Sequence, residues 1–236
     1  MTFSSDFKEA EWKAQVQQAE KFETKAIHAL REMFAEQERE ALKNLEKAVN
    51  RDAVLLDDRK VRESYIATMT PHLIEVMKTA VKNGMDLVRP KNPHKSDPLS
   101  GLSQAAIDWL KTRMAWAAAQ VGDETEQLLR AQLLAGYENG ESIPQISDRI
   151  KQVFDNMEDY RAERIARTEI MSASNQGTLE GYWDSGVVDK VEFYTALDER
   201  TCDYCNEYQG QLFDKGEEMP IPLHPNCRCI YLAVLK

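Results

Sequence analysis

Residues 201–229 read TCDYCNEYQGQLFDKGEEMPIPLHPNCRC and contain all four cysteines of the 236-residue chain. Cys202 and Cys205 are separated by two residues, and His224 comes shortly before Cys227 and Cys229. A Cys-x-x-Cys pair in a tight turn points both sulfurs at one place, and zinc prefers four thiolate and imidazole ligands in a tetrahedron. This stretch therefore predicts a small fold that is stabilised by a structural Zn²⁺.

Five candidate ligands compete for the four positions of such a site. Cys227 and Cys229 are two residues apart, so on an extended strand they face the same side and their spacing does not separate them. We expect Cys202, Cys205, His224 and Cys229 to bind the metal, or the same set with Cys227 in place of Cys229. The alternatives to a metal are a disulfide between the two cysteine pairs and unbridged cysteines in a core.

The residues around this motif predict a small antiparallel sheet. Residues 190–197 (KVEFYTAL) and 229–234 (CIYLAV) are rich in β-branched and aromatic side chains, and residues 211–213 form a shorter candidate strand between them. So small a sheet buries little apolar surface. A structural zinc supplies folding free energy that the core lacks, on the order of 10 kcal/mol in zinc-finger peptides.

Catalytic motifs do not accompany the cysteines. Zinc deaminases need His-x-Glu, but the residues two positions after the four histidines are Leu30, Ile74, Ser96 and Asn226. The chain also lacks His-Glu-x-x-His and a glycine-rich phosphate loop. We therefore expect a protein that is not an enzyme. The alternative is a metal-dependent hydrolase or nuclease-like enzyme that uses the Cys/His centre with Glu169 or Asp198 as acid or base.

A polar helix precedes the sheet. Residues 158–183 are predicted to be helical and carry Arg167, Thr168, Glu169 and Asn175. One interpretation is a recognition or catalytic face. The interpretation that we expect is a polar network, completed by Asp198, that ties the helix to the terminal sheet and satisfies buried backbone groups.

The rest of the chain reads as helices. Residues 6–54 contain no proline or glycine and carry a narrow apolar stripe, which predicts pairing with the next helix or with another subunit. A helix over residues 58–82 contains Pro71, which should kink or divide it, and Asn83-Gly84 should end it. Further helices are expected over residues 103–121, 123–137 and 143–154, the last with Ser142 as its N-cap.

Residues 89–101 (RPKNPHKSDPLSG) contain three prolines and predict a loop between two domains. We expect an elongated helical arm over residues 1–96. Residues 97–236 should form a second domain, with helices over 103–184 and the sheet and zinc knuckle over 188–236. The predicted fold class is mainly α, with long N-terminal helices, a further helical segment and a small zinc-stabilised antiparallel sheet in a C-terminal α+β module.

Charge distribution restricts the partners. The net charge is −10, with 20 Lys+Arg against 22 Asp+Glu through Gly140 and 10 against 18 after it. A basic phosphate-binding face is therefore not predicted, and a zinc-dependent nucleic-acid binder remains a third interpretation that charge does not support. The chain shows no secretory leader and no apolar stretch of about 18 residues, which predicts a soluble protein without a membrane segment.

Several of these motifs occur together in one known family. Arg167-Thr168-Glu169, Asn175 with Gly177, DERTCDYC at 198–205 and PLHPNCRC at 222–229 resemble the phage Mu protein F-like minor head proteins. The resemblance covers roughly residues 142–234. It implies a head morphogenesis protein of a tailed phage or prophage, which acts at the portal vertex inside the procapsid in head assembly or genome delivery.

The resemblance also implies a location and partners. Such a protein lies in the virion interior and, before assembly, in the host cytoplasm. Portal and capsid proteins are the implied partners, and the N-terminal helix additionally offers a surface for self-association.

Overall fold

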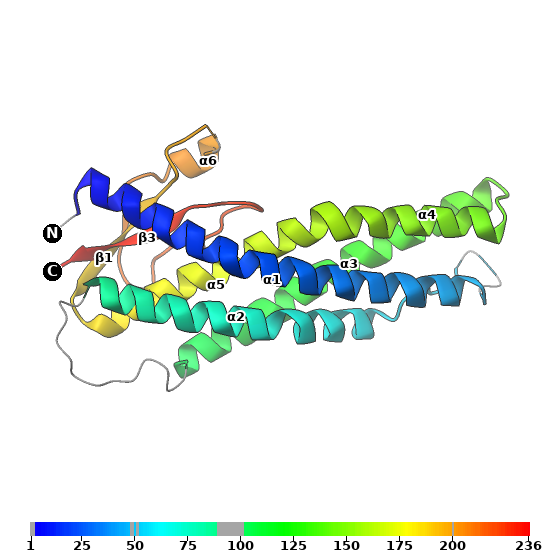
Figure 1. Ribbon diagram of the computed structural model, residues 1–236, viewed down its shortest axis with the longest axis horizontal. Helices are drawn as coiled ribbons and strands as arrows, with labels where there is room; N and C mark the ends of the chain where they lie inside the picture. Colours follow the sequence, from blue (N-terminus) through cyan, green and yellow to red (C-terminus); the bar gives the residue numbers. More distant parts are fainter. Residues whose placement is uncertain (1–2, 48–49, 51, 89–101, 200) are drawn as a thin grey trace. The chain divides into compact units, whose positions relative to one another are not determined.

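Helices make up most of the molecule, and three strands form one antiparallel sheet near its C-terminus (Figure 1). The computed structural model describes residues 3–47, 50, 52–88, 102–199 and 201–236. The predicted fold class is confirmed in its helical body and its small C-terminal sheet. In chain order the elements are α1 (Ser5–Leu45), α2 (Asp58–Val88), α3 (Gln104–Glu138), α4 (Ile143–Asn156), η1 (Met157–Arg161), α5 (Ala162–Ser185), β1 (Val188–Tyr194), α6 (Asp203–Asn206), β2 (Leu212–Phe213) and β3 (Ile230–Leu235).

Two glycines that were expected to end helices lie inside them. The stop predicted at Asn83-Gly84 is wrong, because α2 continues to Val88. The two helices predicted over 103–121 and 123–137 are one helix, α3, with Gly122 in its interior. Helix α2 is also continuous through Pro71, and α1 spans 41 residues and ends at Leu45.

Local signals place the next helices correctly. Ser142 is the N-cap of α4, and its backbone N–H donates to Gln145 Oε1 at 2.9 Å. The helices predicted over 143–154 and 158–183 are joined by the π-helical turn η1. Its last residue, Arg161, is buried and donates to Thr125 Oγ1 at 2.9 Å and to the Val121 carbonyl at 3.0 Å. The irregular turn thus directs a cation into the helix interface.

The chain divides into two compact units. Unit 1 comprises Met1–Thr24, His72–Leu110 and Arg164–Lys236, and unit 2 comprises Lys25–Pro71 and Lys111–Glu163. The loop predicted over 89–101, with the domain boundary at 96/97, lies outside the described residues. Among the described helices, none has the long apolar stretch that crossing a membrane requires.

The core of unit 1 lies between the sheet and α5. The strand order is β2-β1-β3, and Phe193 on β1 pairs with Tyr231 on β3. Their rings meet edge to face with centroids 6.1 Å apart. Tyr182 of α5 is fully buried against the same strands, and Cys205, Cys227 and Cys229 belong to this cluster of buried side chains. The cysteines are therefore part of the core of unit 1.

Helices α2 and α5 cross at glycine residues. A Cβ added at Gly177 would lie 2.7 Å from the Met77 carbonyl oxygen, and one at Gly181 would lie 2.3 Å from that of Val81. Gly84 makes the reciprocal contact from α2, where an added Cβ would meet a backbone oxygen of α5 at 2.7 Å. Only glycine allows the two backbones to approach so closely. This contact explains why Gly84 does not end α2.

Candidate metal centre

The Cys-x-x-Cys pair forms a tight turn at the start of a very short helix. Cys202 is the N-cap of α6, and the backbone N–H of Cys205 donates to Cys202 Sγ at 3.4 Å. This hydrogen bond directs the first sulfur back over the turn. Cys205 is buried and Cys202 is half-buried. The turn, residues 202–205, thereby presents two sulfurs from one short segment, as the spacing predicts.

His224 completes a first group of candidate ligands. Its Nε2 lies 3.3 Å from Cys202 Sγ and 3.2 Å from Cys205 Sγ. Its Nδ1 lies 2.8 Å from the Pro225 carbonyl oxygen, so a proton on Nδ1 is donated there. The lone pair of Nε2 then faces the two sulfurs. A ring fixed through its second nitrogen in this way is typical of a metal-ligating histidine.

Cys205 belongs to a second group as well. The ligand atoms of Cys202, Cys205 and His224 all lie within 4.8 Å of one another, and so do those of Cys205, Cys227 and Cys229. The Sγ atoms of Cys205 and Cys227 are 3.8 Å apart. A zinc tetrahedron with Zn–S of about 2.3 Å requires sulfurs about 3.8 Å apart. All five predicted ligands therefore lie around Cys205, and these two groups could each hold a metal ion.

Hydrogen bonds among the thiols shift their pKa values in opposite directions. A hydrogen bond from Cys229 lowers the pKa of the Cys227 thiol to about 5, whereas the same bond together with burial raises the pKa of Cys229. Burial raises the pKa of the Cys205 thiol to about 12. A dication bound by Cys205 must therefore displace the proton that burial favours on that thiol.

Helix α5 holds the loop that carries the second half of the motif. We call residues 224–229 (HPNCRC) the ligand loop. Asn226 in this loop has a left-handed backbone with φ of 66°. Its Oδ1 accepts from Arg167 Nη1 at 3.1 Å, and its backbone N–H donates to Thr168 Oγ1 at 3.4 Å. Two hydrogen bonds with α5 therefore hold Asn226 in this conformation between His224 and Cys227.

The other predicted polar residues are placed as follows. Asn175 is buried on α5, and its Nδ2 donates to the Cys229 carbonyl at 3.1 Å, at the start of β3. Glu169 is buried on the same helix, and Asp198 lines the cavity beside the cysteines. The structure thus brings Arg167, Thr168 and Asn175 directly onto the ligand loop.

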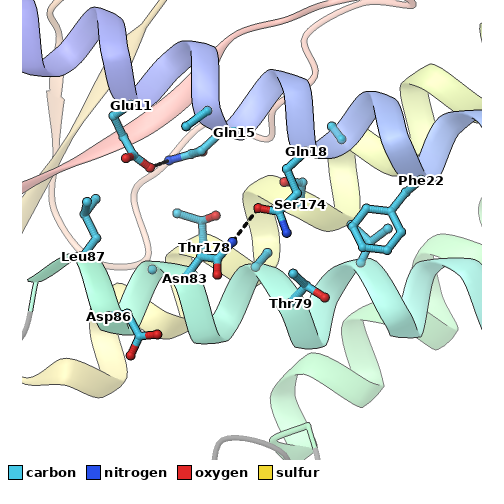
Figure 2. Close-up of a pocket in the computed structure, with 15 residues that line it drawn as sticks. Glu11, Gln15, Gln18, Phe22, Thr79, Asn83, Asp86, Leu87, Ser174 and Thr178 are labelled. Carbon is cyan, nitrogen blue, oxygen red and sulfur yellow. Dashed lines mark hydrogen bonds between the residues drawn. The ribbon is translucent and has the colours of Figure 1, made fainter.

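The described residues of unit 1 line at least two cavities. One, of about 600 Å³, opens beside the ligand loop and the Cys-x-x-Cys turn, with all five candidate ligands in its wall. The other, of about 320 Å³, lies between α1, α2 and α5, and Figure 2 shows the residues that line it. Asn83 Nδ2 donates across it to Gln18 Oε1 at 2.6 Å, and Gln15 Nε2 donates to Glu11 Oε1 at 2.8 Å. The thiol and imidazole groups that could bind a metal therefore line the first cavity.

Comparison with known proteins identifies the part of the chain that carries this site. Residues 127–232 match the family described as Phage Mu protein F like protein. This segment is similar to the phage Mu protein F-like family. The resemblance seen in the sequence is confirmed, and the match points to a role in phage head morphogenesis. No curated protein and no solved structure matches the chain.

The Mu F-like segment is contacted by a helix that lies outside it. Trp12 of α1 donates from its indole Nε1 to the Arg228 carbonyl at 2.8 Å. The Arg228 guanidinium makes a two-armed hydrogen bond to Glu23 of α1, with Nη2 3.1 Å from Oε2. The sequence interpretation missed these contacts. The sequence signal for these contacts was Glu23, because a carboxylate that interrupts an apolar stripe indicates a cationic partner elsewhere in the fold.

Proposed function

We propose that this protein is a minor head-morphogenesis protein of a tailed phage or prophage, which acts at the portal vertex inside the procapsid in head assembly or genome delivery. The match of residues 127–232 to the Mu F-like family is the observation that carries the proposal. Portal or capsid proteins are the partners. Residues 1–96 contribute a helical docking arm, and residues 97–236 form the head-morphogenesis domain.

Reconstituted procapsids test this role. The full chain is co-expressed with the coat, scaffolding and portal proteins of the same phage, and purified procapsids are analysed by quantitative mass spectrometry. We expect the chain in particles that contain portal and its loss from matched particles assembled without portal. Equal incorporation in both preparations would refute the location at the portal vertex, and absence from both would refute the head role.

We further propose that the Cys/His cluster binds one structural Zn²⁺. The 3.8 Å spacing of the Cys205 and Cys227 sulfurs and the orientation of His224 Nε2 support this. Elemental analysis of protein purified under reducing conditions should find one zinc per chain. The variant His224→Ala should lose it, and the matched control His28→Ala, whose ring is 75% exposed on α1, should keep it. Protein without bound metal would overturn this assignment.

The identity of the last ligand can be tested separately. Cys227→Ser and Cys229→Ser each remove one thiol from the group around Cys205. The variant that lacks a true ligand should bind zinc at least tenfold more weakly, because one of four metal–ligand bonds is lost. The other variant should bind nearly as tightly as the wild type. Equal losses would mean that both thiols share the position.

A catalytic metal is the competing function, and the cavity of about 600 Å³ beside the ligands is the observation in its favour. Cobalt substitution distinguishes the two. A saturated structural site gives the visible spectrum of tetrahedral cobalt and no exchangeable water, whereas a catalytic site keeps an open position for water. Relaxation of solvent protons by the bound cobalt would support the enzyme and contradict a closed structural site.

A further inference from the structure

We propose that metal binding at the ligand loop fastens the first part of α1, residues 5–24, onto the C-terminal sheet. The inference rests on the proposed zinc site and extends it to a helix outside the family match. In the view of Figure 1 this part of α1 crosses β3, and Trp12 contacts Arg228 just before that strand begins. The metal thereby acts as a latch between segments that lie about 216 residues apart in the sequence.

Arg228 is the residue that joins the two segments. It lies between Cys227 and Cys229, so its backbone position is set by its two neighbours. Its carbonyl accepts the Trp12 indole proton, and its guanidinium binds Glu23, which is 4% exposed. Both contacts depend on where the ligand loop lies. Any force that fixes this loop therefore also fixes the surface on which α1 docks.

A second route runs from the same carboxylate. Glu23 Oε2 lies 3.6 Å from Arg167 Nε, and Arg167 donates to Asn226 in the ligand loop. One buried acid on α1 thus contacts two guanidiniums that both reach the ligand loop. Charge-assisted contacts of this kind are stronger than neutral ones but demand defined positions of their partners.

A bound metal fixes the positions of these partners by fixing the ligand loop. Without an ion, α5 still holds one side of the loop through Arg167, Thr168 and Asn175, but the side that faces the ligands has only weak contacts among the thiols, such as Cys205 with Cys227 at 3.8 Å. A bound ion replaces them with metal–ligand bonds that fix several ligands at once. Docking of α1 onto a loop that is already ordered loses less conformational entropy, so zinc binding and helix docking must favour each other.

Hydrogen exchange on the full chain tests the latch. Zinc content is measured first, and amide exchange is then followed by mass spectrometry with and without a zinc chelator. We expect residues 5–24 to exchange about tenfold faster or more after chelation, while residues 25–45 of the same helix, in unit 2, keep their protection. A chain that binds zinc but whose residues 5–24 exchange equally in both states would refute the latch and leave the zinc site standing.

The remaining outcomes are also decisive. A chain that binds no zinc refutes both proposals. Loss of protection over residues 25–45 as well as 5–24 refutes a selective latch, because the metal would then hold the whole helix.

Reciprocal coupling gives an independent test. The variant Trp12→Phe keeps the ring but removes the N–H that reaches Arg228. Because linkage is symmetric, loosening the helix must weaken metal binding, by about five- to tenfold for one hydrogen bond. Competition with a chromophoric chelator measures the affinity. The matched control Trp116→Phe, at a side chain on α3 that is 53% exposed, should leave it unchanged, and an unchanged affinity in Trp12→Phe would overturn the coupling.

Discussion

The glycine crossing of α2 and α5 gives a sharp prediction about stability. In Gly181→Ala the new methyl group would lie 2.3 Å from the Val81 carbonyl oxygen and 2.9 Å from the Met85 backbone nitrogen. Both are backbone atoms, so no side chain can rotate away. Ordinary contact begins near 3.4 Å, and the two helices must therefore separate by about 1 Å.

This separation determines the magnitude. A gap of 0.5–1 Å forfeits about a quarter to a half of each dispersion contact along the crossing, and overpacking typically costs about 1–3 kcal/mol. Alanine returns about 1 kcal/mol through its higher helix propensity. Because Gly177 and Gly84 also make close backbone contacts, at 2.7 Å, the whole crossing must open, and we expect a net loss near the upper end, about 2 kcal/mol. For a chain of this length the melting temperature should fall by about 4–8 °C.

Gly122→Ala in α3 is the matched control. There the added methyl group would meet Asp58 Oδ1 at 2.7 Å, which is the end of a side chain that can move. Helix propensity should then prevail, and this variant should be as stable as the wild type or up to about 1 kcal/mol more stable. Urea unfolding followed by circular dichroism measures both variants. Equal shifts of the two midpoints would show that the α2–α5 backbones are not in close contact.

Three further substitutions test individual contacts by the same unfolding measurement. The Glu192 carboxylate is 8% exposed and is paired with Lys8 at 2.6 Å. Lys8→Met removes this cation and should destabilise the protein by about 2 kcal/mol at pH 7. Full stability in the variant would show that the ion pair contributes nothing. Asn175→Ala should cost about 1–2 kcal/mol by removing the donor to the Cys229 carbonyl, and a smaller loss than in a surface Asn156→Ala control would contradict that role. Burial and neighbouring carboxylates raise the pKa of Glu158, so the contribution of this group to stability is favourable below its unfolded pKa and is lost as the pH rises through its folded pKa. Glu158→Gln should therefore stabilise the protein slightly at pH 7, by up to about 0.5 kcal/mol, and not at pH 4. An equal effect at both pH values would exclude titration of Glu158 as the cause.

Local patterns were sufficient for much of the fold. Ser142 was identified as an N-cap because capping depends on residues three positions apart, and the strands were found because β-branched and aromatic side chains are concentrated within each short segment. The ligand cluster was predicted for a related reason, since two short motifs each carry their own geometry. Both kinds of signal lie within a few residues of the chain.

The missed features depend on partners far away in the sequence. Glycine is common at helix ends, but packing against another helix places Gly84 and Gly122 in the interiors of α2 and α3. That packing is not visible in the local sequence pattern. The Glu23–Arg228 pair joins residues 205 positions apart. An acid in an apolar stripe shows that a partner is needed, but the sequence does not say which of 30 lysines and arginines it is.

The pairing of Trp12 with the residue between the last two cysteines has a consequence for biosynthesis. At translation rates of about 5–20 residues per second, α1 leaves the ribosome on the order of tens of seconds before its docking site exists. During that interval α2 can already pack on α1, but the contacts of Trp12 and Glu23 with Arg228 cannot form. The N-terminal helix of unit 1 therefore reaches its final packing only after nearly the whole chain has been synthesised.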